Sequence, residues 1–181
     1  MNFQELINNR QSVRKYSDKA VEKEKIKRCI EAARLAPSAS NSQPWKLLII
    51  DNPELKNKVA KETCGKLIKF NKFVLEAPLI IVIVLEKAKV KTRIGEKIKS
   101  KEWRLIDIGI AAEHFCLQAT EEGLGTCMLG WYNEKPIKKL LNIPDNKPIG
   151  LLISVGYPEK NYKLRKKIRK HIEQVVSYNA Y

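Results

Sequence analysis

The sequence has little of the material from which common catalytic and metal sites are built. Its two histidines, His114 and His171, stand far apart in the chain, which leaves little for a histidine-based metal site or a Ser-His-Asp triad. No CxxC pair occurs among its four cysteines, which are Cys29, Cys64, Cys116 and Cys127. Three of the cysteines fall in apolar helical or strand patterns, as reduced, buried cysteines do. We therefore expect no disulfide framework, no zinc knuckle and no bound metal.

Long apolar runs are also missing. The longest, LIIVIVL at 79–85, is far too short to span a bilayer. The opening residues, MNFQELINNR, lack an apolar core of signal-peptide length. We therefore expect a soluble protein of the cytoplasm that does not enter a membrane.

Acidic residues are few beside the basic ones. The 181 residues include 35 Lys and Arg against 20 Asp and Glu, which gives a formal net charge of +15. Such an excess favours an anionic partner, either nucleic acid, an acidic membrane or a phosphorylated small molecule, and does not choose among them. Much of the excess is lysine scattered along the chain, as on an ordinary solvated surface. Hydrophobic residues at 44% and charged residues at 30% indicate one globular domain over 1–181.

The apolar pattern switches between helical and strand periods without a steady βαβ rhythm. Helices are predicted where apolar residues recur at helical spacing, at 22–35, from 53 onward, at 66–76 and at 103–122. Strands are predicted at 45–51, 79–85 and 149–155, with a short one after the glycines at 123 and 125. Helix 103–122 is apolar almost all round, so it is central or packs against another subunit. The elements predict an α+β sandwich with a mostly buried sheet and helices on both faces.

Two segments are highly charged, and the first of them, 86–102, lacks a steady period. Residues 86–102 are predicted to form a surface excursion. The tail at 157–181 is basic and ends in an apolar and aromatic, strand-like piece, VVSYNAY. No internal repeat or low-complexity linker divides the chain.

Two basic stretches could hold an anion. Arg10, Ser12 and Arg14 offer two guanidinium forks and a hydroxyl before the first long helix, which suits a phosphate as well as a solvated loop. Lys163 and Arg165 fall on one side of an extended segment. With the basic residues that follow them they also suit a nucleic-acid or membrane patch, although no aromatic stacking platform accompanies them.

Two further stretches are loops. Residues 37–45, PSASNSQPW, place small polar side chains between two prolines, where they could bond a flat heteroaromatic ligand or simply connect a helix to a strand. Residues 123–130, GLGTCMLG, are not a dinucleotide fingerprint, because their glycines lack GxGxxG spacing and no strand precedes them. Glycine there lets a backbone approach a ligand ring or serves tight packing.

In this order the stretches resemble the nitroreductase family of FMN-dependent oxidoreductases over nearly the whole chain. The motifs are Arg-x-Ser-x-Arg from Arg10, Pro-Ser-x-x-Asn-x-Gln-Pro-Trp from Pro37, Asp-x-Gly-x-Ala from Asp107, GLGTC-x-x-G from Gly123, and Lys-x-Arg from Lys163. The resemblance implies a nitroreductase-like α+β sandwich whose central sheet is mixed or mostly antiparallel and flanked by helices. It also implies a homodimer with two FMN sites at the subunit interface. The tail at 157–181 would wrap the partner and exchange its C-terminal segment with it.

The resemblance further assigns residues to the flavin. Arg10, Lys163 and Arg165 would hold the FMN phosphate. Ser12 would bond the ribityl-phosphate arm, and Arg14 would approach the pyrimidine edge. The other cofactor-binding residues would be Gln11, Asn71 at the pyrimidine, Leu129 and Gly130 near N5, and, on the loop that reaches the flavin of the other subunit, Pro37, Ser38, Ala39, Ser40, Asn41 and Gln43.

The implied activity takes a hydride from NADH or NADPH and reduces a nitroaromatic, quinone or related small acceptor in a ping-pong scheme. Because flavin does the redox work while the protein binds and orients it, no catalytic side chain is expected. The implied partners are a second subunit and small molecules, with neither nucleic acid nor membrane. The alternative is a flavin-binding or basic nucleic-acid-binding protein without turnover, which the charge of +15 and the basic run at 163–170 favour.

Overall fold

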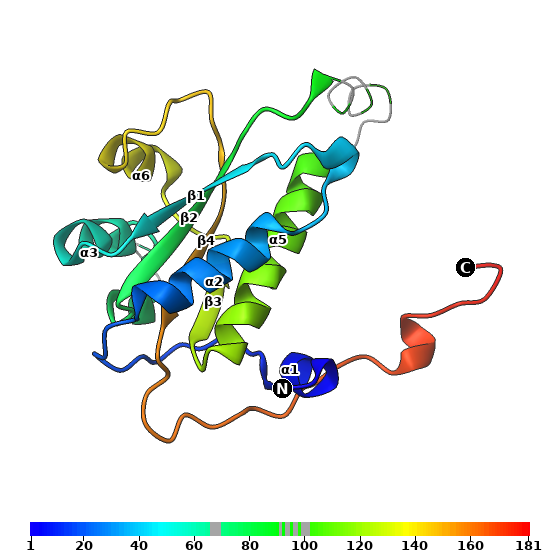
Figure 1. Ribbon diagram of the computed structural model, residues 1–181, viewed down its shortest axis with the longest axis horizontal. Helices are drawn as coiled ribbons and strands as arrows, with labels where there is room; N and C mark the ends of the chain where they lie inside the picture. Colours follow the sequence, from blue (N-terminus) through cyan, green and yellow to red (C-terminus); the bar gives the residue numbers. More distant parts are fainter. Residues whose placement is uncertain (66–69, 91, 93–94, 96–97, 99–101) are drawn as a thin grey trace.

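Four strands form the sheet at the centre of the computed structural model, which describes residues 1–65, 70–90, 92, 95, 98 and 102–181 (Figure 1). The described strands pair antiparallel throughout, in the order β1-β2-β4-β3. They are β1 (Trp45–Ile50), β2 (Leu79–Leu85), β3 (Gly125–Leu129) and β4 (Ile149–Gly156). Every residue of β2 is buried, as its unbroken apolar run predicts for a strand covered on both faces.

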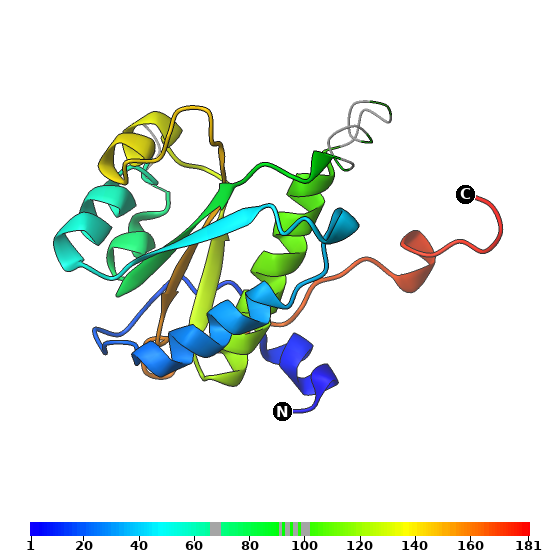
Figure 2. The same ribbon diagram turned by 45° about the horizontal axis from the view of Figure 1, so that its top comes forward.

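Side chains that alternate along β2 divide the core in two. Ile81 and Ile83 pack beneath α2 and α5, whereas Ile80 and Val82 pack on the opposite side beneath α3 and α6. Figures 1 and 2 show the two pairs of helices on opposite faces of the sheet. The helices are α2 (Lys23–Arg34), α5 (Trp103–Glu121), α3 (Pro53–Lys61) and α6 (Glu134–Leu140). The predicted α+β sandwich with helices on both faces is confirmed.

Helices α1 and α3 each begin at an asparagine cap. α1 (Phe3–Asn9) begins in a capping box, in which the Asn2 side chain accepts from the Glu5 amide at 2.9 Å. The Glu5 carboxylate in turn accepts from the Asn2 amide at 3.0 Å. At the start of α3, Asn52 accepts a backbone hydrogen bond and Pro53 occupies the first turn, as the Asn-Pro pair predicts.

The helix α5 lies at the centre of the molecule, as its apolar surface predicts. It packs along α2 and over the sheet, and Phe115 at its middle is fully buried. Its first turn leaves Leu105 and Ile106 exposed, so some of its apolar surface is uncovered in the single chain. Within the described ranges, no helix combines the length and apolarity that crossing a membrane requires.

The helix predicted over 66–76 is wrong for the residues described there. Asn71 takes a left-handed φ of 65°, which an α-helix cannot accommodate. The chain then makes only the four-residue 3-10 helix η2 (Lys72–Leu75). The first part of this prediction, 66–69, lies outside the described residues.

The charged segment predicted as a surface excursion is described only in part, at 86–90, 92, 95, 98 and 102. Ala88 and Thr92 are buried there. The Thr92 hydroxyl lies 2.8 Å from the Ser42 hydroxyl and donates to the Ala39 carbonyl at 3.3 Å. The described part of the segment therefore contacts the loop at 37–43.

The tail at 157–181 leaves the body beside α1 and carries the C-terminus far from the sheet (Figure 1). Its only regular element is the short 3-10 helix η3 (Ile172–Gln174), and the strand-like ending forms no strand. A strand needs a neighbour for its backbone groups, and in both ribbon views the tail lies away from the sheet edges of its own chain. Ile168 and Tyr178 are each 86% exposed.

Candidate functional site

The segment 10–14 lies directly against β3. The Val13 amide donates to the Thr126 carbonyl at 2.8 Å, and Ser12 forms a parallel bridge with Thr126. Gly125 makes this approach possible, because a Cβ on it would stand 2.7 Å from a methyl group of Val13. Gly125, the second glycine of the GLGTC motif, is therefore a packing requirement for the wall that carries Arg10, Ser12 and Arg14.

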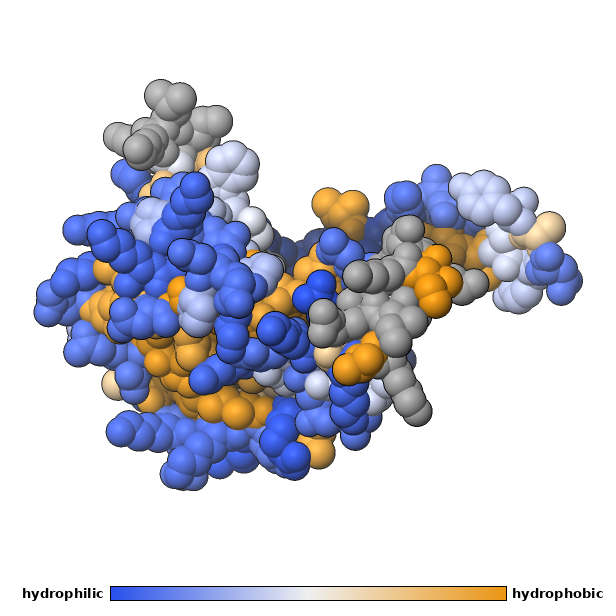
Figure 3. Space-filling view, turned by 90° about the horizontal axis from the view of Figure 1, so that it is seen from above, coloured by the Kyte–Doolittle hydropathy of each residue, from blue (hydrophilic) through white to orange (hydrophobic). Residues whose placement is uncertain are grey.

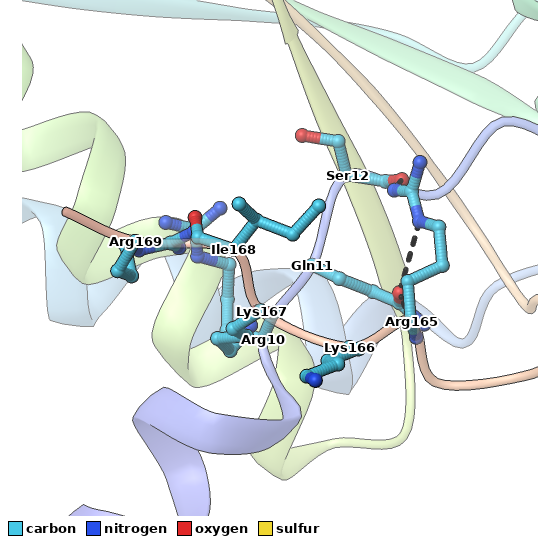
Figure 4. Close-up of a pocket in the computed structure, with 8 residues that line it drawn as sticks. All are labelled: Arg10, Gln11, Ser12, Arg165, Lys166, Lys167, Ile168 and Arg169. Carbon is cyan, nitrogen blue, oxygen red and sulfur yellow. Dashed lines mark hydrogen bonds between the residues drawn. The ribbon is translucent and has the colours of Figure 1, made fainter.

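The basic tail docks on this wall from more than 150 positions away in the chain. The Gln11 side chain donates to the Lys163 carbonyl at 3.2 Å and accepts from the Arg165 amide at 3.1 Å. The Arg165 guanidinium donates to Gln11 Oε1 at 3.3 Å and also to the Ser12 carbonyl. Figure 4 shows Arg165 reaching toward Gln11 and Ser12.

Between the wall and the tail lies an open cavity of about 360 Å³ (Figure 4). Of the described residues that line it, five are cationic, and the full lining is Arg10, Gln11, Ser12, Arg165, Lys166, Lys167, Ile168 and Arg169. One carboxylate stands against this charge, since Arg10 Nε donates to Glu113 Oε1 of α5 at 3.0 Å. The Lys167 ammonium donates to the Arg10 carbonyl.

The excess of positive charge in the cavity acts on the Lys167 ammonium. Burial lowers the pKa of Lys167, and the charges of three neighbouring arginines lower it further. A cation in such surroundings gains from a nearby anion, because opposite charge offsets the mutual repulsion. The cavity is thus suited to a phosphate, which accepts several charge-assisted hydrogen bonds at once.

Of the predicted phosphate-binding residues, the structure brings Arg10 and Arg165 to the cavity. Lys163 does not line it, and its carbonyl accepts from the Gln11 side chain. Lys166, Lys167 and Arg169 were not assigned to the flavin from sequence, yet they line the cavity. The sequence feature that could have indicated them is the KKIRK run after Arg165. This run also suits a nucleic-acid-binding patch. Only the docking of the tail shows that part of the run turns inward.

Arg14 lies near the same end of β3 as the cavity wall. Its side chain is exposed, and its amide donates to the Tyr162 hydroxyl at 3.1 Å. Burial raises the pKa of the Cys127 thiol, while the charge of Arg14 and a hydrogen bond with Ser12 act in the opposite direction. Arg14 and Ser12 therefore lie together beside Cys127, at the surface of the sheet.

The far end of β3 is open. Leu129 is buried and paired with Leu152, whereas Gly130 is exposed and a Cβ on it would meet nothing within 4 Å. Asn71 lies near this end of β3, because the ring of its neighbour Phe70 makes an edge contact with Trp131 at a centroid distance of 5.3 Å. The Asn71 side chain donates to the Thr63 carbonyl at 3.2 Å.

The loop at 37–43 is held by internal bonds and by α5. The Ala39 amide donates to Asp107 Oδ1 at 3.1 Å, which links two of the motifs. The Gln43 amide donates to the Ser38 hydroxyl at 2.9 Å. The loop contains the 3-10 turn η1 (Ala39–Asn41) and three positive φ angles, at Ser40, Asn41 and Gln43. Such backbone is locally costly for residues other than glycine and clusters at ligand sites.

Within one chain this loop and the cationic cavity do not meet. The loop binds Asp107 and Arg10 binds Glu113, six residues further along α5, which is about 9 Å of rise and a different face of the helix. Figures 1 and 2 place η1 beside one end of α5 and α1 toward the other. The assignment of Pro37, Ser38, Ala39, Ser40, Asn41 and Gln43 to the flavin of a partner subunit stays a prediction.

Comparison with known proteins identifies the family. The family model described as "Nitroreductase family" matches residues 7–157. The chain belongs to the nitroreductase family. It is therefore an oxidoreductase. A relative from Archaeoglobus fulgidus named "Putative NADH dehydrogenase/NAD(P)H nitroreductase" is 30% identical over 158 residues, which are 85% of this chain and 84% of that protein.

Solved structures agree with the fold. A nitroreductase family protein from Clostridium novyi NT is 36% identical with a TM-score of 0.78 and covers 88% of this chain and 87% of its own. An FMN-dependent nitroreductase from Clostridium difficile R20291 is 28% identical with a TM-score of 0.77, over 97% and 98% of the two chains. Human iodotyrosine deiodinase 1 is also similar, at 27% identity over 96% of this chain and 67% of its own.

Proposed function

We propose that this nitroreductase-family chain binds FMN, takes a hydride from NADH or NADPH and reduces a nitroaromatic, quinone or related small acceptor. The observation that carries the proposal is the cationic cavity between residues 10–12 and the tail. The names of similar proteins support it, since one is FMN-dependent and another is named for NAD(P)H nitroreductase activity.

The cavity residues fit the phosphate of FMN. A phosphate monoester carries a charge near −2, and about 360 Å³ leaves ample room for it. Arg10 and Arg165 would provide planar guanidinium donors, and Lys166 and Lys167 would add charge. Ser12 would meet the ribityl arm, and the side chain of Arg14, exposed beside it, would present a cation to the pyrimidine edge.

Bound FMN would supply the two-electron carrier between donor and acceptor. The chain would then orient that group and leave one face accessible. The exposed backbone at Gly130, at the end of β3, meets this need because, apart from its chain neighbours, nothing lies within 4 Å of the place where its Cβ would stand. A single accessible face would serve donor and acceptor in turn, which is the basis for proposing a ping-pong scheme.

We also propose a homodimer in which the loop at 37–43 completes the site of the partner. Exposed apolar surface supports the pairing, both on α5 at Leu105 and Ile106 and on the tail at Ile172 and Val175. Figure 3 shows hydrophobic residues at the surface of the body and along the projecting tail. The tail would bury its apolar side chains by wrapping the second subunit.

The test begins with the purified protein. We expect it to bind FMN, to lose the yellow flavin absorbance under anaerobic NADH or NADPH, and to regain it when a quinone or nitroaromatic is added. Protein that stays colourless after incubation with FMN would overturn the proposal. Binding without bleaching would favour a passive flavin-binding protein. Nucleic-acid binding that falls steeply with salt, in place of flavin binding, would favour the basic-patch alternative.

A further inference from the structure

Trp131 is unusually exposed to solvent for a tryptophan. It follows Gly130 at the end of β3, and 62% of its surface is exposed. Tryptophan is highly buried on average, because its large ring gains much from leaving water. The other two tryptophans, Trp45 and Trp103, are less exposed in this chain.

The exposed ring stands on a fixed backbone. Leu129 before it is paired in the sheet with Leu152. After it, the Tyr132 hydroxyl donates to the Ile149 carbonyl at 2.6 Å, and the Asn133 amide donates to the Glu62 carbonyl at 2.8 Å. Trp131 is therefore displayed from a short span that is anchored on both sides.

The ring itself is also held. Phe70 packs against it edge to face, with ring centroids 5.3 Å apart and planes at 66°. This geometry is favourable for aromatic pairs and uses the edge of one ring, so that a ring face stays available for stacking. A preorganised ring loses little freedom when a ligand stacks on it.

A neutral acceptor needs such a surface. NADH and NADPH carry phosphates that basic side chains can hold, whereas a quinone or uncharged nitroaromatic offers no charge to the cations of the cavity. Besides hydrogen bonds to its oxygens, its binding depends on apolar and π contact with its ring. Gly130, just before Trp131, is exposed, and apart from its chain neighbours no atom lies within 4 Å of the place where its Cβ would stand.

We infer that Trp131 is the stacking platform for planar, uncharged acceptors and thereby sets the acceptor specificity of this enzyme. The inference rests on the proposed flavin chemistry, which places Gly130 near the reacting edge of FMN. Trp131 contacts the acceptor and carries no proton or electron.

Two substitutions at the same position isolate the aromatic face. Trp131→Phe keeps a ring, and Trp131→Leu keeps an apolar side chain without one. Each is compared with the wild-type holoenzyme, using menadione as the planar acceptor and ferricyanide, an octahedral anion, as the acceptor without a ring. We expect Trp131→Leu to raise the KM for menadione about five- to tenfold, as loss of one stacking contact predicts, and Trp131→Phe about twofold or less.

FMN content and the KM for ferricyanide should stay at wild-type values in both variants. Phe70→Leu should raise the KM for menadione in the same direction by a smaller factor, since it only frees the platform. An unchanged KM for menadione in Trp131→Leu, or an equal rise for ferricyanide, would overturn the inference. Wild-type protein that neither binds FMN nor bleaches would instead reject the proposed function, and the inference with it.

Discussion

Replacing Arg10 with alanine should weaken FMN binding about ten- to thirtyfold without unfolding the protein. Arg10 lines the cationic cavity and uses its Nε for Glu113 at 3.0 Å. A charge-assisted hydrogen bond contributes about 1.5–3 kcal/mol. Because the Arg10 side chain is 31% exposed, solvent screening places the loss near the lower end, at about 1.5–2 kcal/mol.

The measurement is a fluorescence titration of flavin-free protein with FMN at one ionic strength. Lys15→Ala is the matched control, because it removes the same charge from an exposed side chain whose partner, Glu159, is 3.5 Å away. We expect the control to change the Kd less than twofold. An Arg10→Ala Kd within twofold of wild type, or an equal loss in Lys15→Ala, would refute the role of Arg10.

Replacing Glu113 with glutamine should have the opposite effect on FMN affinity. The amide keeps an oxygen that can accept from Arg10 Nε but removes the carboxylate that offsets the charge of the cavity. We expect FMN to bind about three- to tenfold more tightly, because a phosphate then meets a more positive site. Weaker binding would mean that Glu113 mainly positions Arg10.

Three further predictions concern the support of the site. Gln11→Ala leaves the net charge unchanged but removes the bonds that dock the tail, so we expect FMN affinity to fall about five- to tenfold while the unfolding midpoint in urea changes little. Gly125→Ala should lower the free energy of unfolding in urea by about 1–3 kcal/mol, because the added methyl group meets Val13. Gly109→Ala, where a Cβ meets nothing within 4 Å, should leave that free energy unchanged or raise it by about 0.5–1 kcal/mol. Equal effects of the two substitutions would contradict the packing argument. When thiols are titrated with a thiol reagent at pH 8, the buried Cys29, Cys116 and Cys127 should react only on unfolding, because burial raises their pKa and the neutral thiol is unreactive. Fast reaction of more than one cysteine, Cys64, in the native protein would contradict this.

The sequence predicted most elements because their signals are local. The run LIIVIVL is buried along its whole length as β2, and the Asn-Pro pair at 52–53 begins α3. The helix wrongly predicted at 66–76 also has a local cause, which apolar spacing does not reveal. Asparagine tolerates a left-handed backbone, and at Asn71 it takes one, which ends helical geometry where the apolar spacing favours it.

The site divides in the same way. Residue types and their order indicated an anion site at Arg10 and Arg165, and the structure places both at one cavity. Neither the inward turn of Lys167 nor the neutralising contact of Glu113 with Arg10 could be predicted, because each depends on a contact between distant parts of the chain.

By itself, then, the sequence determined most of the elements, the two-faced burial of the sheet and the motifs that mark the family, since periodicity and residue chemistry are properties of short segments. Tertiary structure alone decided which cations face one another, that Gly125 admits the wall carrying Ser12, and that Trp131 is left exposed on an anchored turn. The physical reason is that these features arise from packing between segments far apart in the chain, where close contact, and not local preference, selects the arrangement.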